Sequence, residues 1–462
     1  MFIRQFYTNC LAQAAYYVES KGEALIIDPL RDTKPYLDLA QERGAKIRHI
    51  LETHFHADFV SGHLELARQT GAIIIYGGGA RPRYRALVAN DGEVLSLGEI
   101  RIRILHTPGH TLESCCFLLL DEQGKEYCLF TGDTLFAGDV GRPDLMSGNL
   151  SKETLASMLY DSLNKKIMPL ADNLIIYPGH GPGSACGKHI GRETVTTLGE
   201  QKRTNYALME QDRDAFILKI TEGLVSPPAY FFKDAGINAN GYQPLEEVML
   251  RAQRQLLPEE WKKAALEGAV LLDTRTAEVF AKGHVKGAIN IGLNGDFAVW
   301  AGTLLPFDNP IVLFTEKGSE KESITRLARI GYDSILGCAA VPDEAGEQSR
   351  VELVYPETFR NVVKEGKYVI LDVRRPAETE KRKLKNAMLM PLAELPQRFQ
   401  ELNKEDRLLI CCAGGYRSMI AASFLNANGF EQTSSIAGGI DRIEREASEL
   451  VTHYFFKEKS AG

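Results

Sequence analysis

One short run, Thr53–Phe59, constrains what this chain can fold into more than any other part of the sequence. It follows an apolar, strand-like segment and carries His54, His56 and Asp58 at alternate positions, so three side chains that can bind a metal lie together at one end of that segment. Such a pattern normally continues with a His directly after the aspartate. Phe59 stands there instead and cannot bind a metal. The run therefore predicts a metal site that has lost one donor.

Three later motifs contain residues that could complete this site. Each follows a strand-like segment or sits in a Gly-containing loop, where a rigid scaffold presents binding residues. They are His110 in a Thr-Pro-Gly-His-Thr motif, Asp133 at the end of a Phe-Thr-Gly-Asp motif, and His180 in a Tyr-Pro-Gly-His-Gly motif. With the first run they outline a site similar to that of the metallo-β-lactamases.

The donor set predicts iron. Two His and one carboxylate that leave open positions favour mononuclear non-haem Fe(II), and we expect His54, His110 and Asp133 to be its ligands. We expect His56, Asp58 and His180 to orient these ligands through hydrogen bonds. Zinc with an activated water is the alternative, which Phe59 weakens. The remaining candidates are interpreted as ordinary surface or core residues: His49, His63, His106, His189 and His453.

At 462 residues the chain is long enough for about three domains. Strand-like and helix-like segments alternate up to about residue 240, where a stretch rich in Pro, Gly and Asn follows. We predict an α/β protein with a first domain over 1–243, a helical connector over 244–258, and two further domains over 259–346 and 352–462. The clearest strand-like segments of the first domain are residues 24–28, 72–76, 100–104 and 174–177.

The last two domains are predicted from an internal repeat. The segment 270–275 is echoed by 369–374, and in each copy a second apolar strand follows at almost the same separation, over 311–315 and 408–412. Both of these strands lead into a Gly-containing loop and a helix. Two small α/β domains of one kind are the simplest account.

The second copy carries a cysteine where its second strand meets the loop. Cys412 precedes Ala-Gly-Gly-Tyr-Arg-Ser, and we expect a helix to begin at Ser418. The positive end of that helix and Arg417 favour a thiolate, while the glycines let backbone N–H groups face an anion on the sulfur. Cys412 is therefore a candidate nucleophile suited to carrying a persulfide. Cys411 points the other way and is predicted to pack in the core.

The first copy lacks this chemistry. Thr315 stands in place of Cys412, and Glu320 stands in place of Arg417. Without a thiol, and with acidic residues that would repel an anionic intermediate, this copy is predicted to be catalytically inactive. Its expected role is packing or positioning.

Composition excludes several classes of function. A net charge of -7 argues against nucleic acid or an anionic membrane as a partner. No apolar run approaches the ~18 residues of a membrane span, and polar residues interrupt residues 1–19, which do not read as a signal peptide. Eight cysteines without the spacing of a disulfide framework fit a reducing compartment. We expect a cytoplasmic enzyme, and a homo-oligomer because that is the common case.

Taken together, these motifs resemble a persulfide dioxygenase of metallo-β-lactamase fold joined to two rhodanese modules, the first of them degenerate. The resemblance covers essentially the whole chain and implies an αββα sandwich followed by two rhodanese-like α/β domains. It implies one Fe(II) per chain on His54, His110 and Asp133. The implied reaction oxidises a thiol persulfide, such as glutathione persulfide, by O2 to sulfite and the free thiol. Cys412 would accept a sulfane sulfur and exchange it with sulfite, forming or using thiosulfate.

The resemblance also suggests two residues near the substrate. Arg142 matches an arginine that the family places there, although a structural salt bridge is an equal alternative. Cys186, in the loop after His180, could line the entrance and exchange sulfur, or could be a plain packed thiol. Residues 381–385 are a basic stretch where the family has a Gly-His-Ile-like one, which the first copy keeps at 283–285.

Two other functions stay open. One is a zinc thioester hydrolase of the glyoxalase II type with an appended sulfurtransferase, against which Phe59 argues. The other is a persulfide-sensing or docking module, in which Cys412 would not be needed for sulfur transfer to sulfite.

Overall fold

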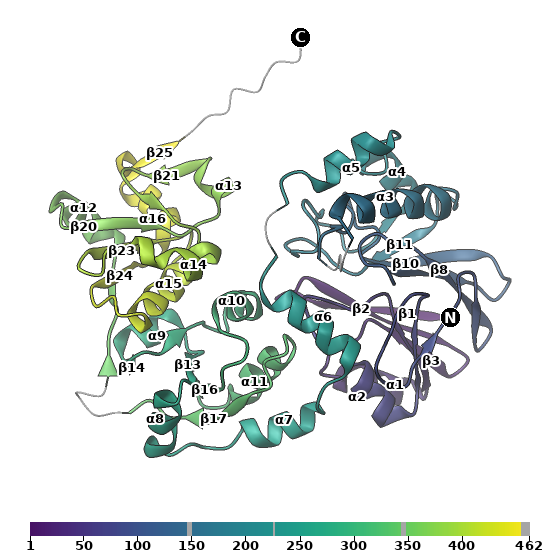
Figure 1. Ribbon diagram of the computed structural model, residues 1–462, viewed down its shortest axis with the longest axis horizontal. Coiled ribbons are helices and arrows are strands. Elements are labelled where there is room, and N and C mark those ends of the chain that lie inside the picture. Colours follow the sequence, from purple (N-terminus) through teal and green to yellow (C-terminus); the bar gives the residue numbers. More distant parts are fainter. Residues whose placement is uncertain (146–149, 225–226, 343–347, 454–462) are drawn as a thin grey trace, which may run out of the picture. The chain divides into compact units, whose positions relative to one another are not determined.

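The computed structural model describes residues 1–145, 150–224, 227–342 and 348–453 (Figure 1). The chain forms two compact units, which are described separately: Met1–Val248 with Thr325–Asp333, and Met249–Ile324 with Ser334–Gly462. The predicted domain end at residue 346, and residues 454–462 of the last predicted domain, lie outside the described residues. Within the described ranges, every helix is too short or too polar to cross a membrane.

The first unit contains two six-stranded sheets. The strands are β1 Phe2–Thr8, β2 Gln13–Ser20, β3 Glu23–Ile27, β4 Lys46–Glu52, β5 Ile73–Tyr76, β6 Leu87–Val88, β7 Val94–Leu97, β8 Ile100–His106, β9 Cys115–Leu120, β10 Glu126–Gly132, β11 Ile175–Pro178 and β12 Thr196–Thr197. One sheet has the order β1-β2-β3-β4-β5-β6 and the other β12-β11-β10-β9-β8-β7. Apolar side chains of both sheets meet in one core, because alternate residues of each strand face the opposite sheet. The four predicted strands correspond to β3, β5, β8 and β11.

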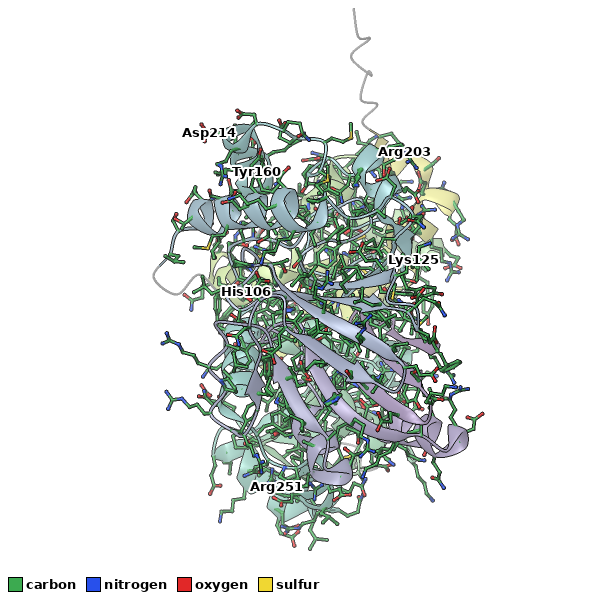
Figure 2. All side chains as sticks on the ribbon, turned by 90° about the vertical axis from the view of Figure 1, so that its right-hand side faces the viewer. His106, Lys125, Tyr160, Arg203, Asp214 and Arg251 are labelled. Carbon is green, nitrogen blue, oxygen red and sulfur yellow. The ribbon has the colours of Figure 1, made fainter. Side chains whose placement is uncertain are left out.

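Helices cover the outer face of each sheet. The helices of this part of the chain are α1 Lys34–Arg43, α2 His63–Thr70, α3 Lys152–Ser162, the π-helix η1 Leu163–Ile167, α4 Leu198–Thr204, α5 Arg213–Thr221 and α6 Tyr230–Asn240, and α7 Leu245–Ala252 continues past Val248 into the second unit. One apolar cluster joins α1 and α2 to the first sheet, and another joins α3, η1, α4 and α5 to the second. In Figure 2, Tyr160 marks α3 and Asp214 marks α5. The predicted αββα sandwich is confirmed.

Local sequence determines where these helices end. Gly44 and Gly71 adopt left-handed φ values of 66° and 71° directly after α1 and α2, a conformation that glycine adopts without a steric cost. Ser151 caps the start of α3, and its hydroxyl accepts a hydrogen bond from the backbone N–H of Thr154.

The second unit contains two larger parallel sheets, one for each sequence repeat, and two antiparallel pairs of short strands. Its strands are β13 Val270–Asp273, β14 His284–Val285, β15 Ile289–Asn290, β16 Ile311–Phe314, β17 Ile335–Ala339, β18 Gln348–Ser349, β19 Glu352–Val354, β20 Tyr368–Asp372, β21 Arg382–Leu384, β22 Met388–Leu389, β23 Arg407–Cys411, β24 Thr433–Ile436 and β25 Val451–His453. The sheet orders are β15-β13-β16-β17 and β19-β24-β23-β20-β22. The repeated segments occupy equivalent central strands, so the predicted pair of α/β domains is confirmed.

Helices flank both sheets of this unit. They are α8 Pro258–Leu266, α9 Ala277–Lys282, α10 Phe297–Leu304, α11 Glu320–Ala328, α12 Pro356–Lys364, α13 Pro376–Thr379, η2 Leu392–Glu394, α14 Leu395–Arg398, η3 Phe399–Glu401, α15 Tyr416–Ala427, α16 Gly439–Glu446 and η4 Ser448–Leu450. The helix expected at Ser418 begins two residues earlier, at Tyr416. Pro258 begins α8, where its missing N–H costs no hydrogen bond.

Candidate metal centre and sulfur-transfer loop

The first unit gathers His54, His110 and Asp133 in one buried cluster. His54 follows β4, His110 lies between β8 and β9, and Asp133 directly follows β10. The Nε2 atom of His110 lies 3.3 Å from Oδ2 of Asp133, and that of His54 lies 4.0 Å from the same oxygen. Both carboxylate oxygens of Asp133 are buried and have no hydrogen-bond partner among the described residues. A divalent cation fits this donor set, because it would satisfy the converging nitrogens and oxygen.

Hydrogen bonds turn the ligand face of each histidine toward the cluster. Nδ1 of His54 lies 3.0 Å from Oγ1 of Thr53, and Nδ1 of His110 lies 2.9 Å from the carbonyl oxygen of Arg142. A ring nitrogen bonded in this way leaves Nε2 free to bind a metal. Burial, together with the neighbouring imidazoles of His56 and His110, lowers the pKa of His54 well below its usual value. A neutral imidazole is the form that coordinates.

Gly109 allows the His110 loop to pack tightly on α3. Its φ is 146°, and a Cβ atom at this position would lie 2.4 Å from the Cα atom of Leu159. A side chain here would push the loop away from the helix. The Pro-Gly-His motif therefore positions His110 through close contact with α3.

His56 is directed away from the cluster. Its Nε2 atom lies 3.1 Å from Oδ1 of Asp28 and 3.5 Å from Oε2 of Glu52, and its ring stacks on Phe59 with 4.3 Å between centroids. Burial opposes a charge on His56, but the two carboxylates outweigh it and raise the pKa of His56 well above its usual value. Nε2 of His56 therefore faces these two carboxylates and not the cluster of His54, His110 and Asp133.

A second buried group lies beside the first. It consists of Asp58, His180 and Cys186, whose ligand atoms lie within 4.8 Å of one another. Oδ2 of Asp58 is 3.5 Å from Nε2 of His180, which is 3.6 Å from Oδ1 of Asp133. Burial, and then the charges of Asp58 and Asp133, raise the pKa of the Cys186 thiol. Sequence reasoning placed Cys186 only at the entrance and did not find this grouping.

Arg142 forms an ion pair with a neighbour. Its guanidinium donates two hydrogen bonds of 2.7 Å to the carboxylate of Asp144 and one of 3.3 Å to the carbonyl oxygen of Ala185. The side chain is buried. Of the two interpretations of Arg142, this geometry favours the structural salt bridge. The expected contact with substrate stays a prediction.

In the second unit, the loop between β23 and α15 wraps around Cys412. The backbone N–H of Gly415 points at Sγ of Cys412 over 3.1 Å, and Oγ of Ser418 lies 3.5 Å from the same sulfur. Gly415 has a left-handed φ of 101°, which turns its N–H inward. The thiol of Cys412 donates to Oγ of Ser418, and the N–H of Gly415 would stabilise negative charge on the sulfur. Cys411 packs in the apolar core, as predicted.

Arg417 is paired with Glu378 of α13. The guanidinium donates two hydrogen bonds of 2.7 Å to the carboxylate. Burial raises the pKa of Glu378, but the hydrogen bonds from Arg417 and from the backbone of Arg375 outweigh it, so that this pKa lies below its usual value. Part of the positive charge expected to act on Cys412 is therefore neutralised by Glu378.

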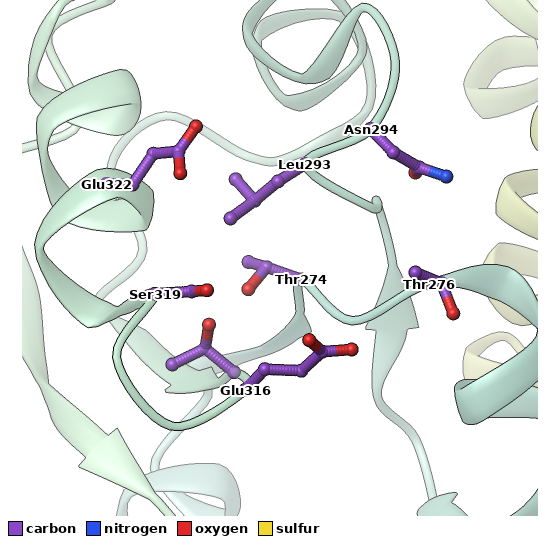
Figure 3. Close-up of a pocket in the computed structure, with 8 residues that line it drawn as sticks. Thr274, Thr276, Leu293, Asn294, Glu316, Ser319 and Glu322 are labelled. Atoms are coloured by element: carbon purple, nitrogen blue, oxygen red, sulfur yellow. The ribbon is translucent and has the colours of Figure 1, made fainter.

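The first repeat has a pocket of about 260 Å³ beside its equivalent loop (Figure 3). None of the described residues that line it carries a thiol, and the carboxylates of Glu316 and Glu322 lie at its border. Glu320, which we expected to oppose an anion, accepts a hydrogen bond from the backbone N–H of Gly318 instead. The residues that line the pocket are Thr274, Thr276, Leu293, Asn294, Thr315, Glu316, Ser319 and Glu322.

Comparison with known proteins identifies both parts of the chain. Residues 8–180 match the model of the metallo-beta-lactamase superfamily. A crystal structure of a metallo-beta-lactamase from Staphylococcus aureus subsp. aureus COL is 35% identical, with a TM-score of 0.66, and the match covers 74% of this chain and 99% of that one. The chain belongs to the metallo-β-lactamase superfamily. Residues 257–337 and 355–446 match the rhodanese-like domain, so this superfamily member also carries two rhodanese-like domains.

Two further proteins are similar to the metallo-β-lactamase part. A probable hydroxyacylglutathione hydrolase of Schizosaccharomyces pombe is 34% identical over 187 residues, which are 39% of this chain and 69% of the relative. The crystal structure of ETHE1 from Myxococcus xanthus is 29% identical with a TM-score of 0.45, and the match covers 52% of this chain and 98% of that one. Metal ions are bound by the metallo-β-lactamase fold, and the first cluster lies among the residues that match it.

Proposed function

We propose that this protein is a bifunctional sulfur-metabolism enzyme: an Fe(II)-dependent persulfide dioxygenase with an attached sulfurtransferase. The observation that carries the proposal is the diversion of His56 to Asp28 and Glu52. Because His56 faces those carboxylates, the cluster retains two imidazoles and one carboxylate, the donor set that favours mononuclear Fe(II) with open positions. His54, His110 and Asp133 would hold one iron per chain.

The bound iron would supply the one-electron chemistry that lets dioxygen react with sulfur. The protein's own residues prepare the site for it. Thr53 and the Arg142 carbonyl orient the two imidazoles, and burial of the cluster excludes bulk water. The overall reaction combines a thiol persulfide, O2 and water to give the thiol, sulfite and two protons. The outer sulfur atom loses four electrons, and dioxygen accepts them.

Glutathione persulfide is the proposed carrier. The Schizosaccharomyces pombe relative is named for hydrolysis of a hydroxyacylglutathione. A site derived from the same superfamily would retain room for the glutathione portion, while its reactive end changes from a thioester to a persulfide.

The proposed sulfurtransferase uses Cys412. A persulfide on its sulfur would lie against the N–H of Gly415 and the hydroxyl of Ser418. Sulfite attacks the outer sulfur, the sulfur–sulfur bond to Cys412 breaks, and the electron pair returns to the cysteine as thiolate while thiosulfate leaves. The reverse reaction would load Cys412 from thiosulfate. Sulfite made by the first unit is thus an acceptor for the second.

Oxygen consumption tests the dioxygenase. Iron-loaded, full-length protein should consume O2 when glutathione persulfide is added, and His110→Ala should lose both the iron and the uptake. His106→Ala is a matched control, because His106, labelled in Figure 2, lies at the end of β8, is not one of the clustered residues, and has its Nε2 atom 3.1 Å from the carbonyl oxygen of Leu112. Absence of uptake, or equal uptake in both variants, would overturn the proposal.

The Schizosaccharomyces pombe relative is named a probable hydroxyacylglutathione hydrolase. This name favours one competing function, a zinc thioester hydrolase of the glyoxalase II type. Two zinc ions per chain and hydrolysis of a hydroxyacylglutathione, with no uptake of O2, would establish that function instead. A docking role for the rhodanese-like pair predicts that Cys412→Ser leaves sulfur transfer unchanged.

We also place the enzyme in the reducing cytoplasm, because all eight cysteines, which lie among the described residues, are free.

A further inference from the structure

We propose that the first rhodanese-like domain acts on the metal centre: its segment Thr325–Asp333, together with Asn238 of α6, holds the loop that carries His54. This loop comprises residues 53–61, directly after β4. Asn238 and Arg31, which links the segment to the loop, are positioning residues for metal binding. The inference rests on the proposed function only in that His54 binds a metal.

The segment belongs to one domain by sequence and to another by packing. Residues 257–337 match the rhodanese-like domain, whereas Thr325–Asp333 packs as part of the first unit. The segment begins in the last turn of α11 and continues past the end of that helix. Its residues Ile330 and Tyr332 are buried. The domain without a nucleophile therefore contributes a buried segment to the unit that contains the metal cluster.

The segment contacts the loop directly through its backbone. The N–H of Val60 donates a 2.6 Å hydrogen bond to the carbonyl oxygen of Arg329, the first residue after α11. The last carbonyl oxygens of a helix have no partner inside the helix, so they are available to donors from elsewhere. The end of α11 thereby fixes the backbone of Val60, six residues after His54.

Two ion pairs tie the segment to the residues that follow β3. The buried guanidinium of Arg31 donates hydrogen bonds of 2.6 and 2.8 Å to the carboxylate of Asp333 and one of 3.0 Å to the carbonyl oxygen of Ala328. A cation is favoured at this end of a helix, where the partial charge is negative. Asp32 accepts hydrogen bonds of 2.7 and 2.8 Å from the guanidinium of Arg329.

The residues next to Arg31 lie against the end of the loop. Leu30 and Ser61 form a β-bridge, and the N–H of Gly62 donates a 2.7 Å hydrogen bond to the carbonyl oxygen of Pro29. A Cβ atom at position 62 would lie 2.1 Å from the carbonyl oxygen of Leu30, so this close approach requires glycine. A displacement of Arg31 is therefore passed to the loop through its neighbours.

Asn238 holds the loop at three further points. Its Nδ2 atom donates hydrogen bonds of 2.7 Å to the carbonyl oxygens of His56 and Phe59, and its Oδ1 atom accepts one of 2.9 Å from the N–H of Ser61. The side chain is 1% exposed. Only an amide offers two donors and an acceptor in one short side chain, so Asn238 satisfies three backbone groups together.

A fixed loop favours metal binding. His54 lies near the start of the loop, and its Nε2 atom is 4.0 Å from Oδ2 of Asp133. If the loop were mobile, metal binding would have to order it, and this entropic cost would lower the affinity. The contacts from Asn238 and Thr325–Asp333 order the loop before the metal binds.

Metal affinity and amide exchange of the full-length Asn238→Ala and Asp333→Asn variants test this role. We expect the dissociation constants for Fe²⁺ and for Zn²⁺, measured by competition with a chelator, to rise about tenfold, as is typical when a group that orients metal ligands is removed. In the metal-free variants, hydrogen–deuterium exchange should become faster in the peptide that spans residues 53–62. Glu19→Gln is the matched control, because it breaks the ion pair between β2 and Arg43 of α1 in the same unit.

Two results would overturn the positioning role. One is a metal affinity or a loop exchange rate in the two variants equal to that in Glu19→Gln. The other is exchange that becomes equally faster throughout the first unit, because a general loss of stability has that effect. Asp333→Glu keeps a negative charge opposite Arg31 and should recover part of the affinity that Asp333→Asn loses. Absence of any recovery would contradict the ion pair as the cause.

If Asn238→Ala fails to fold, Asp32→Asn takes its place. It removes the ion pair with Arg329 and should change affinity and exchange in the same direction, and values equal to the control would overturn the proposal. Oxygen uptake with glutathione persulfide is measured on the same proteins. Absence of uptake by the unaltered protein contradicts only the dioxygenase, since the Zn²⁺ affinities still test the positioning role. Uptake with equal metal affinities in all variants contradicts only the positioning role.

Discussion

The hydroxyl of Tyr416 donates a 2.7 Å hydrogen bond to the carbonyl oxygen of Gly292, which links the sulfur-transfer loop to the first repeat within one compact unit. The ring also packs on Gly295, where a Cβ atom would lie 2.5 Å from Cζ of Tyr416. Tyr416 is the first residue of α15, four positions after Cys412. The inactive repeat therefore supports the loop that holds the nucleophile.

Gly295→Ala should impair sulfur transfer without affecting the dioxygenase. The added methyl group must displace the ring of Tyr416, and we expect sulfurtransferase kcat/KM to fall about tenfold or more, in line with the sensitivity of catalysis to small misplacements. Tyr416→Phe removes only the hydrogen bond and should cost about 1 kcal/mol of stability, with a smaller loss of rate. Gly236→Ala is the control, because a Cβ atom there meets no atom within 4 Å. Full sulfur transfer in Gly295→Ala would refute the supporting role.

Gly109→Ala should release iron. The new Cβ atom would collide with the backbone of Leu159, so the loop that carries His110 must move. We expect iron affinity to fall at least tenfold in a metal-competition titration. Gly71→Ala is a matched control: its φ is also positive, at 71°, but a Cβ atom there meets no atom within 4 Å. That variant should lose roughly 1–2 kcal/mol of stability and keep its iron. Equal iron affinity in both variants would contradict the role of Gly109.

The spacing of residues predicted which chemical groups gather but not how they pair. His54, His110 and Asp133 could be grouped because each follows a strand or lies in a Gly-containing loop. The position of Cys412 could be predicted because the same strand and loop occur twice. The partner of Arg417 could not, because Glu378 is distant in sequence and approaches only when α13 packs beside α15. Long-range contacts of this kind leave no periodic signal in one sequence.

The same limit explains the interpretation of Phe59. From the sequence, Phe59 in place of a histidine indicated only that a metal site has lost one donor. In the structure, the loop after His180 brings the sulfur of Cys186 within 4.8 Å of the ligand atoms of Asp58 and His180, over a separation that no local motif reports. The sequence places Cys186 in a loop but does not predict its neighbours in space, because these come from other parts of the chain.

Asp28→Asn should destabilise the first unit. The buried carboxylates of Asp28 and Glu52 favour the charged form of His56, and an amide at position 28 cannot neutralise that charge. Removing one partner of a buried pair costs about 3–5 kcal/mol. Asn tolerates the positive φ of 50° at this position, so backbone strain does not contribute to the loss. Asn keeps only one of the two oxygens that accept hydrogen bonds from Thr53, and the double variant described next separates that loss from the effect of charge. Chemical denaturation measures the loss, and the Asp28→Asn/His56→Gln double variant should recover part of it. No recovery would show that the charge is not the cause.

Glu378→Gln should change stability in a pH-dependent way. Burial raises the pKa of Glu378, but the hydrogen bonds from Arg417 and from the backbone of Arg375 lower this pKa by more than burial raises it. Its folded-state pKa therefore lies below the unfolded value of about 4.3. A depressed folded pKa means that the pair stabilises the second unit fully above about pH 5, and that this stabilisation is lost as the pH falls through the folded pKa. The difference in unfolding free energy between the unaltered protein and Glu378→Gln should be constant near neutral pH and shrink below about pH 4. Urea unfolding at a series of pH values measures it. Glu380→Gln is the neighbouring control, and a difference for Glu378→Gln that does not vary with pH would contradict the ion pair with Arg417.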